Sequence, residues 1–286
     1  MTKSHFHHLQ NNEGIIHFGD GCPPADTTVY STTIRPGTYT ISYAIRLGGW
    51  FLKPQILRCD GLIDLPDSTG SEIVESINHF FTEEVKAKYA KYNFLYRRGI
   101  LMYGPPGTGK SAIVYKVINH MIAKEGIVLW NCEPEQIPEV VNRIHSIQPD
   151  VQILVVWEEF ERYKDNEDVL QLLDGGTQIN NVVYLATTNY IEQIPNRLRY
   201  RPSRFAEVIL VGPPTAEVRK TFLQKRIHPD DLKKLDNLQM DSSKEWIDRV
   251  VRLTEGWVID QLTELIRSHF VIGLPVNKAI AAIHSE

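Results

Sequence analysis

The chain has 286 residues, of which 42% are hydrophobic and 23% are charged, as in an ordinary soluble globular protein. Its formal net charge of −4 argues against a global basic field of the kind that attracts nucleic acid or anionic membranes. Three widely spaced cysteines, Cys22, Cys59 and Cys132, form no metal-ligand pattern, so we expect free thiols in a reducing compartment.

No apolar run reaches membrane-spanning length, and the first residues lack the apolar core of a signal peptide. We therefore expect a cytoplasmic protein without a membrane partner. His5, His7 and His8 are the types of residue that bind metals, but no carboxylate or cysteine accompanies them. A polar terminal segment is the favoured interpretation of these histidines.

Three stretches between about 27 and 57 favour β-strands, namely TTVYSTTI, PGTYTISYAIRLGG and WFLKPQIL, with Pro-Gly and Gly-Gly turns among them. They predict a small β-rich N-terminal segment over residues 1–60. A helical rhythm begins near Gly61, where an Asp/Ser-rich cap region precedes apolar residues at helical spacing, among them Ile73, Ile77 and Phe80.

Five short apolar runs follow, and helical stretches separate them; they read GILMY, GIVLWN, QILVVW, NVVYLATT and EVILV. Strands that alternate with helices predict an α/β domain over residues 61–212, with a mostly parallel sheet covered on both faces. Beyond this domain the pattern indicates helices around 215–226, 229–238, 243–254, 258–270 and 275–284. These predict a separate helical lid over residues 213–286.

The stretch GILMYGPPGTGKSAIVYKVINHM predicts a strand, a glycine-rich loop and a helix. Gly104, Gly109, Lys110 and Ser111 meet the phosphate-loop spacing G-x-x-x-x-G-K-[ST]. Small residues let backbone N–H groups point into a concave nest, and the helix N-terminus adds partial positive charge. The motif predicts a nucleoside triphosphate site in a P-loop three-layer sandwich.

Each residue of the loop has an expected role. Lys110 is expected to reach the β- and γ-phosphates and the Ser111 hydroxyl to bind Mg²⁺. The predicted ligands are therefore ATP and Mg²⁺. The predicted nucleotide-binding residues are Gly104, Pro105, Pro106, Gly107, Thr108, Gly109, Lys110, Ser111 and Ala112.

Residues from about 61 to 283, roughly three quarters of the chain, resemble the AAA+ ATPases of the AAA type. The segments YRRGILMYGPPGTGKS and LLDGGTQINNVVYLATTNYIEQIPNRLRYRPSRF carry the resemblance. They look most like the branch that contains the mitochondrial translocase of the Rieske protein and short bacterial and phage relatives. The resemblance implies the AAA+ strand order and assembly into a homo-oligomeric ring, a hexamer by default and a heptamer in the translocase branch.

The same resemblance assigns roles outside the phosphate loop. Asn189, at the end of the run NVVYLATTN, matches the sensor residue that orients the attacking water. Arg201 and Arg204 in RPSRF match arginine fingers, whose planar guanidinium groups suit a transferring phosphoryl group in a neighbouring subunit. The basic stretch NRLRYRPSR could alternatively contact nucleic acid, but no aromatic platform or broad basic face accompanies it.

The run LVVWEEF departs from the family pattern, because Glu158 stands where most members have an aspartate beside Mg²⁺. Mg²⁺ keeps several waters, so a small shift can absorb one methylene; the translocase branch also has glutamate here. Glu159 keeps the position of the catalytic base. The alternative is a chain that binds nucleotide without turnover. Glu161 is interpreted as a solvated charge.

The interval CEPEQIPEVVNRIH lacks the aromatic residue and glycine that ring unfoldases present to their pore. Threading of a substrate is therefore doubtful, and we interpret Trp130 as a core residue and Trp257 as packing within the lid. We expect an Mg²⁺-dependent ATPase that remodels or translocates a protein partner bound by the N-terminal segment. The alternatives are a nucleic-acid-associated ATPase, such as a loader, and a nucleotide-gated scaffold.

Overall fold

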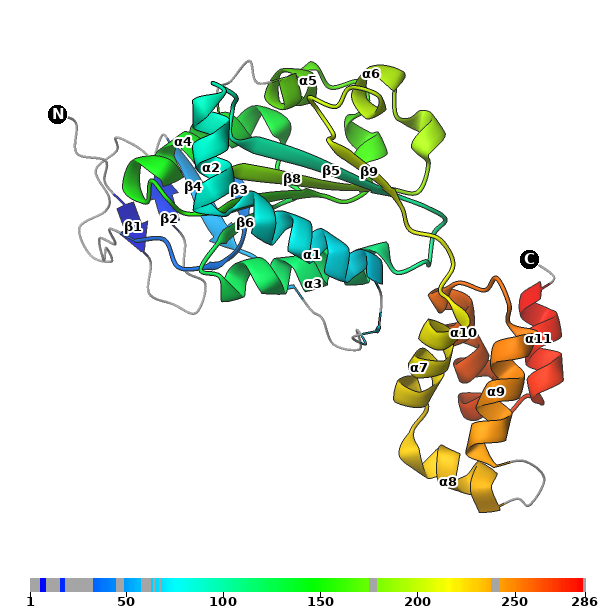
Figure 1. The fold of residues 1–286 in the computed structure, drawn as a ribbon. Coiled ribbons are helices and arrows are strands. Elements are labelled where there is room, and N and C mark those ends of the chain that lie inside the picture. The colour runs from blue at the N-terminus through cyan, green and yellow to red at the C-terminus, as the bar shows by residue number, and fades with distance from the viewer. Residues whose placement is uncertain are drawn as a thin grey trace. The chain divides into compact units, whose positions relative to one another are not determined.

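The computed structural model describes residues 6–8, 16–18, 33–44, 49–57, 63, 65–66, 68–174, 179–237 and 242–284. The chain divides into two compact units (Figure 1). The first comprises residues 1–59, 72–103 and 114–209, and the second comprises residues 60–71, 104–113 and 210–286.

A nine-stranded sheet forms the centre of the first unit. In spatial order its strands are β1 (Phe6–His8), β2 (Ile16–Phe18), β4 (Gly49–Pro54), β3 (Gly37–Ala44), β6 (Ile127–Trp130), β7 (Ile153–Trp157), β8 (Val182–Thr188), β5 (Arg97–Tyr103) and β9 (Glu207–Leu210). The five strands from β3 to β5 in this order run parallel to one another. Every residue of β7 and β8 is buried, as the continuous apolar runs predict.

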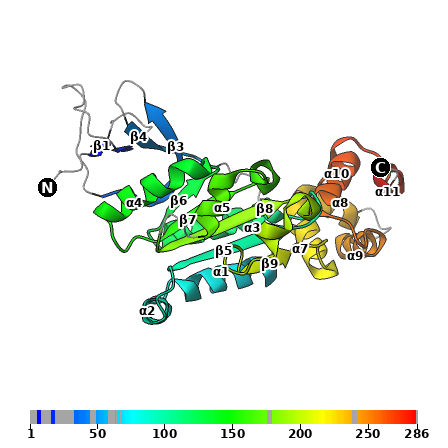
Figure 2. The same cartoon turned by 90° about the horizontal axis from the view of Figure 1, so that it is seen from above.

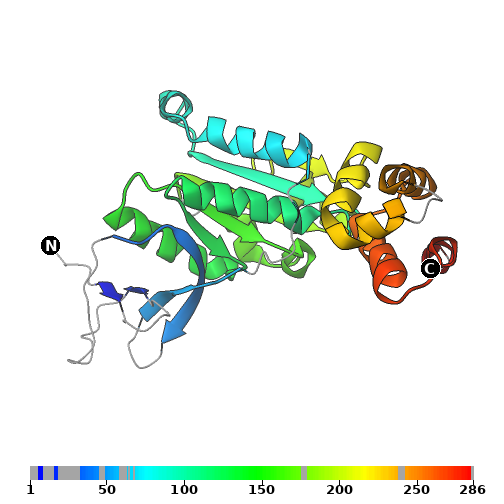
Figure 3. The same cartoon turned by 90° about the horizontal axis from the view of Figure 1, so that it is seen from below.

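Helices cover both faces of this sheet, which confirms the predicted α/β class. Figure 2 and Figure 3 show α4 (Ile137–Ile147) and α5 (Glu167–Asp174) over one face and α1 (Ser68–Phe80) and α3 (Lys110–Ala123) over the other. The remaining helices of the unit are α2 (Glu83–Lys91) and α6 (Asn196–Arg199), with 3₁₀ turns at Pro134–Gln136, Phe160–Tyr163 and Ile191–Gln193.

The N-terminal strands extend the same sheet. β3 pairs in parallel with β6, with Gly37 opposite Ile127, and β4 returns antiparallel to β3. The expected strand run TTVYSTTI lies mostly outside the described residues, and Ile34 at its end is in no strand. The described part of the β-rich segment is therefore continuous with the core that holds the candidate site.

The single helical rhythm expected after Gly61 is two helices in the structure, because the chain turns at Phe81 and Thr82. The Thr82 hydroxyl accepts the backbone N–H of Val85, which caps the start of α2. Trp130, interpreted as a core residue, is only half-buried and stacks on Tyr115 with ring centroids 5.9 Å apart.

Cys132 is a free, buried thiol, as expected, and burial raises its pKa to about 12. Cys22 and Cys59 lie outside the described residues. No helix in the described part of the chain is long and apolar enough to cross a membrane.

The second unit contains the five C-terminal helices that the periodicity predicts. They are α7 (Ala216–Arg226), α8 (Pro229–Asn237), α9 (Ser243–Leu253), α10 (Ile259–Ile266), which continues into a π-helical turn over Arg267–Val271, and α11 (Val276–His284). Trp257 is 2% exposed and belongs to their shared core, so it packs within the lid as interpreted. Ile63 and Leu65 pack against the same core.

Candidate active site

Three predicted site segments follow strands whose carboxyl ends share one edge of the sheet. In the parallel register Tyr103 of β5 lies opposite Thr188 of β8, and Trp157 of β7 lies opposite Ala186. The phosphate loop follows β5, the two glutamates follow β7 and Asn189 follows β8. The carboxyl edge of a parallel sheet is where α/β proteins bind ligands. Segments up to 85 residues apart in sequence therefore start from adjacent strand ends.

The phosphate loop has a backbone that requires glycine. Gly107 and Gly109 have φ angles of +77° and +101°, in the region that L side chains rarely adopt. A Cβ atom on Gly104 would lie 2.1 Å from the carbonyl oxygen of Val211, and one on Gly107 would lie 2.9 Å from the Asp260 side chain. At Gly104 and Gly107 there is therefore room for backbone alone, and α3 begins directly after the loop at Lys110. This is the cradle that a phosphate group would occupy.

Lys110 is folded into that cradle. Its side chain is buried, and its ammonium group donates to the carbonyl oxygens of Gly104 at 2.7 Å and Pro105 at 2.8 Å. The Thr108 hydroxyl donates to the Pro105 carbonyl at 3.0 Å and fixes the same bend. Ser111, the predicted Mg²⁺ ligand, is exposed in the first turn of α3.

The lid holds the phosphate loop through its backbone. The first amides of α10 donate to the Gly107 carbonyl oxygen, from Ile259 at 2.9 Å and from Asp260 at 3.4 Å. The Gln261 side chain accepts the N–H of Val258 and so closes the start of that helix. Gly107 and Ile259 are 152 positions apart in the sequence, which carries no signal for the contact. Two backbone hydrogen bonds therefore link the start of helix α10 to the loop.

Glu158 is held by a residue that the sequence analysis missed. Its backbone N–H donates to the side-chain oxygen of Asn131 at 2.8 Å. Asn131 directly follows β6, has a φ of +45°, and its own N–H donates to the Val156 carbonyl at 2.8 Å. Asparagine tolerates the left-handed region better than most residues. A polar residue directly after the apolar strand next to β7 is the signal that could have identified it.

Glu159 also has a left-handed backbone, with φ +55° and ψ +52°. This conformation costs a non-glycine residue roughly 1–2 kcal/mol and is concentrated at functional sites. The side chain is half exposed, and its carboxylate forms an ion pair with Arg162. Glu161, interpreted as solvated, is half-buried, and within the described residues one of its carboxylate oxygens has no hydrogen-bond partner. Glu161 is therefore only partly solvated, which departs from its interpretation as a solvated charge.

Asn189 is half-buried and follows the last residue of β8. The turn beneath it is fixed by Thr188, which is 1% exposed and whose hydroxyl accepts the N–H of Tyr190 at 3.0 Å. Asn189 is therefore displayed from a rigid strand end, which is what a residue that orients a water molecule requires.

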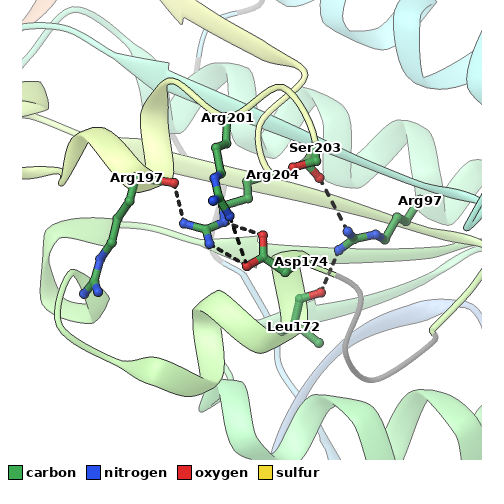
Figure 4. Close-up of polar contacts among 7 residues, drawn as sticks. All are labelled: Arg97, Leu172, Asp174, Arg197, Arg201, Ser203 and Arg204. Atoms are coloured by element: carbon green, nitrogen blue, oxygen red, sulfur yellow. Dashed lines mark hydrogen bonds and ion pairs between the residues drawn. The ribbon is translucent and has the colours of Figure 1, made fainter.

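The two expected arginine fingers lie in different environments (Figure 4). Arg204 is buried and donates from Nε and from a terminal nitrogen to the two Asp174 oxygens at 2.5 Å each. Its other terminal nitrogen donates to the carbonyl oxygen of Arg197. The Arg201 side chain is 61% exposed, and its guanidinium lies 3.7 Å from Asp174. Arg201 is thus largely exposed to solvent, whereas Arg204 is buried and bound to Asp174.

Asp174 organises this cluster. The hydrogen bonds that Arg204 donates, together with the charges of Arg204, Arg201 and Arg97, hold the pKa of Asp174 below its usual value. Arg97 also donates to the carbonyl oxygens of Leu172, at 2.7 Å, and Ser203, at 3.5 Å. Figure 4 shows these bonds joining β5, the end of α5 and the segment that carries Arg201 and Arg204. The position of the arginine segment is thereby fixed to the sheet.

Arg199, another member of the basic stretch NRLRYRPSR, is held within its own segment. It donates to the Asn196 side chain at 2.7 Å and to the Ile191 carbonyl at 3.1 Å, and its guanidinium stacks over Tyr200. These contacts engage the Arg199 guanidinium within its own segment, so they lend no support to the alternative that this stretch contacts nucleic acid.

A mostly parallel sheet with a glycine-rich loop between β5 and α3, and acidic residues after β7, which β8 separates from β5, defines the P-loop class of nucleotide-binding proteins. Residues 100–213 match the family model described as "ATPase family associated with various cellular activities (AAA)". The chain therefore carries an AAA ATPase domain, which confirms the resemblance found in the sequence, and such a domain implies nucleotide binding.

Several curated proteins are similar to this chain. The "ATPase family gene 2 protein" of Saccharomyces cerevisiae is 29% identical over 59% of this chain and 24% of its own length. The "Probable mitochondrial chaperone BCS1-A" of Dictyostelium discoideum is 26% identical over 53% of this chain and 40% of its own length. The "Cell division cycle protein 48 homolog" of Archaeoglobus fulgidus is 31% identical over 59% and 24%, respectively. The matches thus span about a quarter to two fifths of these relatives.

Proposed function

We propose that the protein hydrolyses ATP as a homo-oligomeric AAA-type ring and uses the energy to remodel or translocate a protein partner. One observation carries the proposal: the phosphate loop, the Glu158–Glu159 turn and Asn189 follow adjacent parallel strands at one edge of the sheet. Similarity to AAA proteins, one of them named a mitochondrial chaperone, supports the partner being a protein.

The proposed chemistry assigns one task to each residue. The Lys110 ammonium exchanges its bonds to loop carbonyls for phosphate oxygens. Glu159 accepts the proton of the attacking water, whose oxygen bonds to the γ-phosphorus while the bond to the bridging oxygen breaks and ADP leaves. Asn189 orients that water. The strained backbone of Glu159 supports its role, because such strain persists where the surrounding structure holds it for function.

The donor set fits Mg²⁺, which binds hydroxyl and carboxylate oxygens and retains several waters. We assign its binding to the hydroxyl of Ser111 and the carboxylate of Glu158. The Asn131 side chain fixes the backbone of Glu158, so the longer glutamate is displayed from a defined position. When bound, Mg²⁺ would neutralise charge on the transferring phosphate.

The arginines support the proposed ring. Arg201 is 61% exposed, and we assign it as the finger that completes the site of the next subunit. Arg204, with its side chain 5% exposed and bound to Asp174, is assigned as the residue that fixes the segment. A hexamer is the default expectation and a heptamer the alternative. The protein partner is assigned to the N-terminal strands that extend the sheet.

Mixed rings test this proposal. Glu159→Gln subunits have an inactive site but a normal finger, and Arg201→Ala subunits have an intact site but no finger to give. Each variant alone is expected to lose ADP production. Equal mixing places an intact site beside a normal finger at about one quarter of the interfaces, so about one quarter of wild-type turnover returns.

Arg267→Ala is the matched control, because Arg267 is also 61% exposed and pairs with a single carboxylate in the lid. It is expected to keep wild-type turnover. Mixing that restores no activity would refute a finger acting between subunits. Wild-type turnover in Glu159→Gln alone would refute the assignment of the base. ADP production that survives Lys110→Ala would refute the site itself.

A further inference from the structure

The turn after Glu159 brings the guanidinium of Arg162 into contact with the Glu159 carboxylate. Phe160–Tyr163 forms a 3₁₀ helix, and in this helix residues three apart eclipse each other. The backbone N–H of Arg162 donates to the carbonyl oxygen of Glu159 at 3.0 Å. The guanidinium of Arg162 forms an ion pair with the Glu159 carboxylate. The two residues are therefore linked through both backbone and side chain.

The opposite face of this turn is anchored in the core. Phe160 is fully buried and packs against Trp157 and Phe205, with ring centroids 5.8 Å and 5.3 Å away. The indole N–H of Trp157 donates to the Cys132 carbonyl at 2.9 Å. A turn held in this way points Glu159 and Arg162 outward, and their side chains are 50% and 69% exposed. The anchored backbone of the turn thus fixes the position from which the Glu159 side chain extends.

We propose that Arg162 restrains the side chain of Glu159, holding its carboxylate in an ion pair that must open before the carboxylate can accept a proton from water. This inference rests on the proposed role of Glu159 as the base. The ion pair directs a carboxylate oxygen toward the side chain three residues ahead and neutralises its charge. Because the backbone and Phe160 already set the position of Glu159, the guanidinium adds restraint and no further placement.

The exposure of the pair sets the size of the effect. Ion pairs between exposed side chains are weak and screened by salt, and they shift an equilibrium by at most about fivefold. The restraint therefore lowers the turnover rate by a small factor and does not abolish ATP hydrolysis. Substrate binding is unaffected, because the restraint acts on the base and not on the phosphate loop.

The test compares kcat and KM for ATP in Arg162→Ala, Arg162→Lys and wild type at low and high salt. At low salt Arg162→Ala is expected to raise kcat about two- to fivefold with KM unchanged. Arg162→Lys keeps a cation and is expected to stay close to wild type. At high salt the ratio between Arg162→Ala and wild type is expected to fall toward one.

The lid provides a matched control, because Glu264 and Arg267 form an exposed ion pair with the same spacing and order. Arg267→Ala is expected to leave kcat unchanged, and thermal melting checks that each variant is folded. Unchanged or lower kcat in Arg162→Ala overturns the restraint. A salt-independent gain overturns it as well. If Glu159→Gln keeps wild-type turnover, the proposed function fails and this inference with it; an inactive Glu159→Gln beside an unaltered Arg162→Ala refutes only the restraint.

Discussion

Replacing Arg204 should cost the protein stability, whereas replacing Arg201 should cost it turnover alone. Both arginines match the same motif and both approach Asp174. Arg204 donates two bonds of 2.5 Å to the carboxylate and one bond to the Arg197 carbonyl from a side chain that is 5% exposed. Arg201 approaches no nearer than 3.7 Å and is 61% exposed.

The magnitudes follow from these environments. Removing one partner from a buried, hydrogen-bonded ion pair costs about 3–5 kcal/mol, because the other charge is left buried. The Asp174 side chain is 36% exposed, so water can solvate the carboxylate left behind. We therefore expect Arg204→Ala to lower the free energy of unfolding by about 2–3 kcal/mol. Arg201→Ala should lower it by about 0–1 kcal/mol, as exposed pairs do.

Thermal and urea unfolding of both variants measures this difference. At about 2–4 °C per kcal/mol for a domain of this size, Arg204→Ala should lower Tm by about 4–12 °C. Arg201→Ala should melt close to wild type while ADP production is lost. Arg204→Lys, which keeps the charge but not the two-pronged geometry, should lie between Arg204→Ala and wild type. If the two alanine variants are equally stable, Arg204 is not the anchor of the segment.

Three further outcomes follow from the site. Asn131→Ala removes the acceptor of the Glu158 N–H and should lower kcat about three- to tenfold in a folded protein. Asn131→Asp keeps an acceptor oxygen and should recover most of the lost kcat. Equal kcat values in Asn131→Ala and wild type would contradict the role of Asn131 in holding Glu158. Gly107→Ala places a side chain on a residue with φ +77°, at a cost of about 1–2 kcal/mol. It should weaken nucleotide binding at least severalfold in a fluorescence titration with an ATP analogue. Unaltered affinity would contradict the assignment of this loop as the phosphate-binding site. Because the pKa of Asp174 is depressed in the folded state, its stabilising effect is present above its ordinary value of 3.8 and lost as pH falls below that value. The stability difference between wild type and Asp174→Asn should therefore shrink in urea unfolding below about pH 3.8, and a constant difference would refute the depressed pKa.

The sequence was sufficient for most elements of the fold, because the apolar runs and the helical periodicity are local signals. Buried strands such as β7 and β8 are apolar at nearly every position, and the lid helices repeat apolar residues at helical spacing. The attachment of the N-terminal strands was not predictable in this way. The pairing of β3 with β6 depends on two edges meeting in space, and each strand would look the same with another partner.

The candidate site shows the same division between local and tertiary information. The glycine spacing of the phosphate loop is a local requirement, and the φ angles of Gly107 and Gly109 explain why the motif needs those residues. Asn131 was missed because its role depends on β6 lying beside β7, and no spacing within the sequence encodes that pairing. The contact between α10 and the Gly107 carbonyl is likewise a product of the fold.

Intrachain ion pairs decide which of the motif-matched charges can act outside their own segment. Residue type and motif position treat Arg201 and Arg204 alike, yet Asp174 binds one tightly and leaves the other largely in solvent. In the same way, Glu159 matches the position of a base, but Arg162 lies on its carboxylate. Neither Asp174 nor Arg162 has a role assigned by the motifs, so the motifs alone cannot show which charges are available. A charge in a buried ion pair is held in place and has a structural role. A charge in an exposed ion pair can be released, because water and salt weaken an exposed pair far more than a buried one.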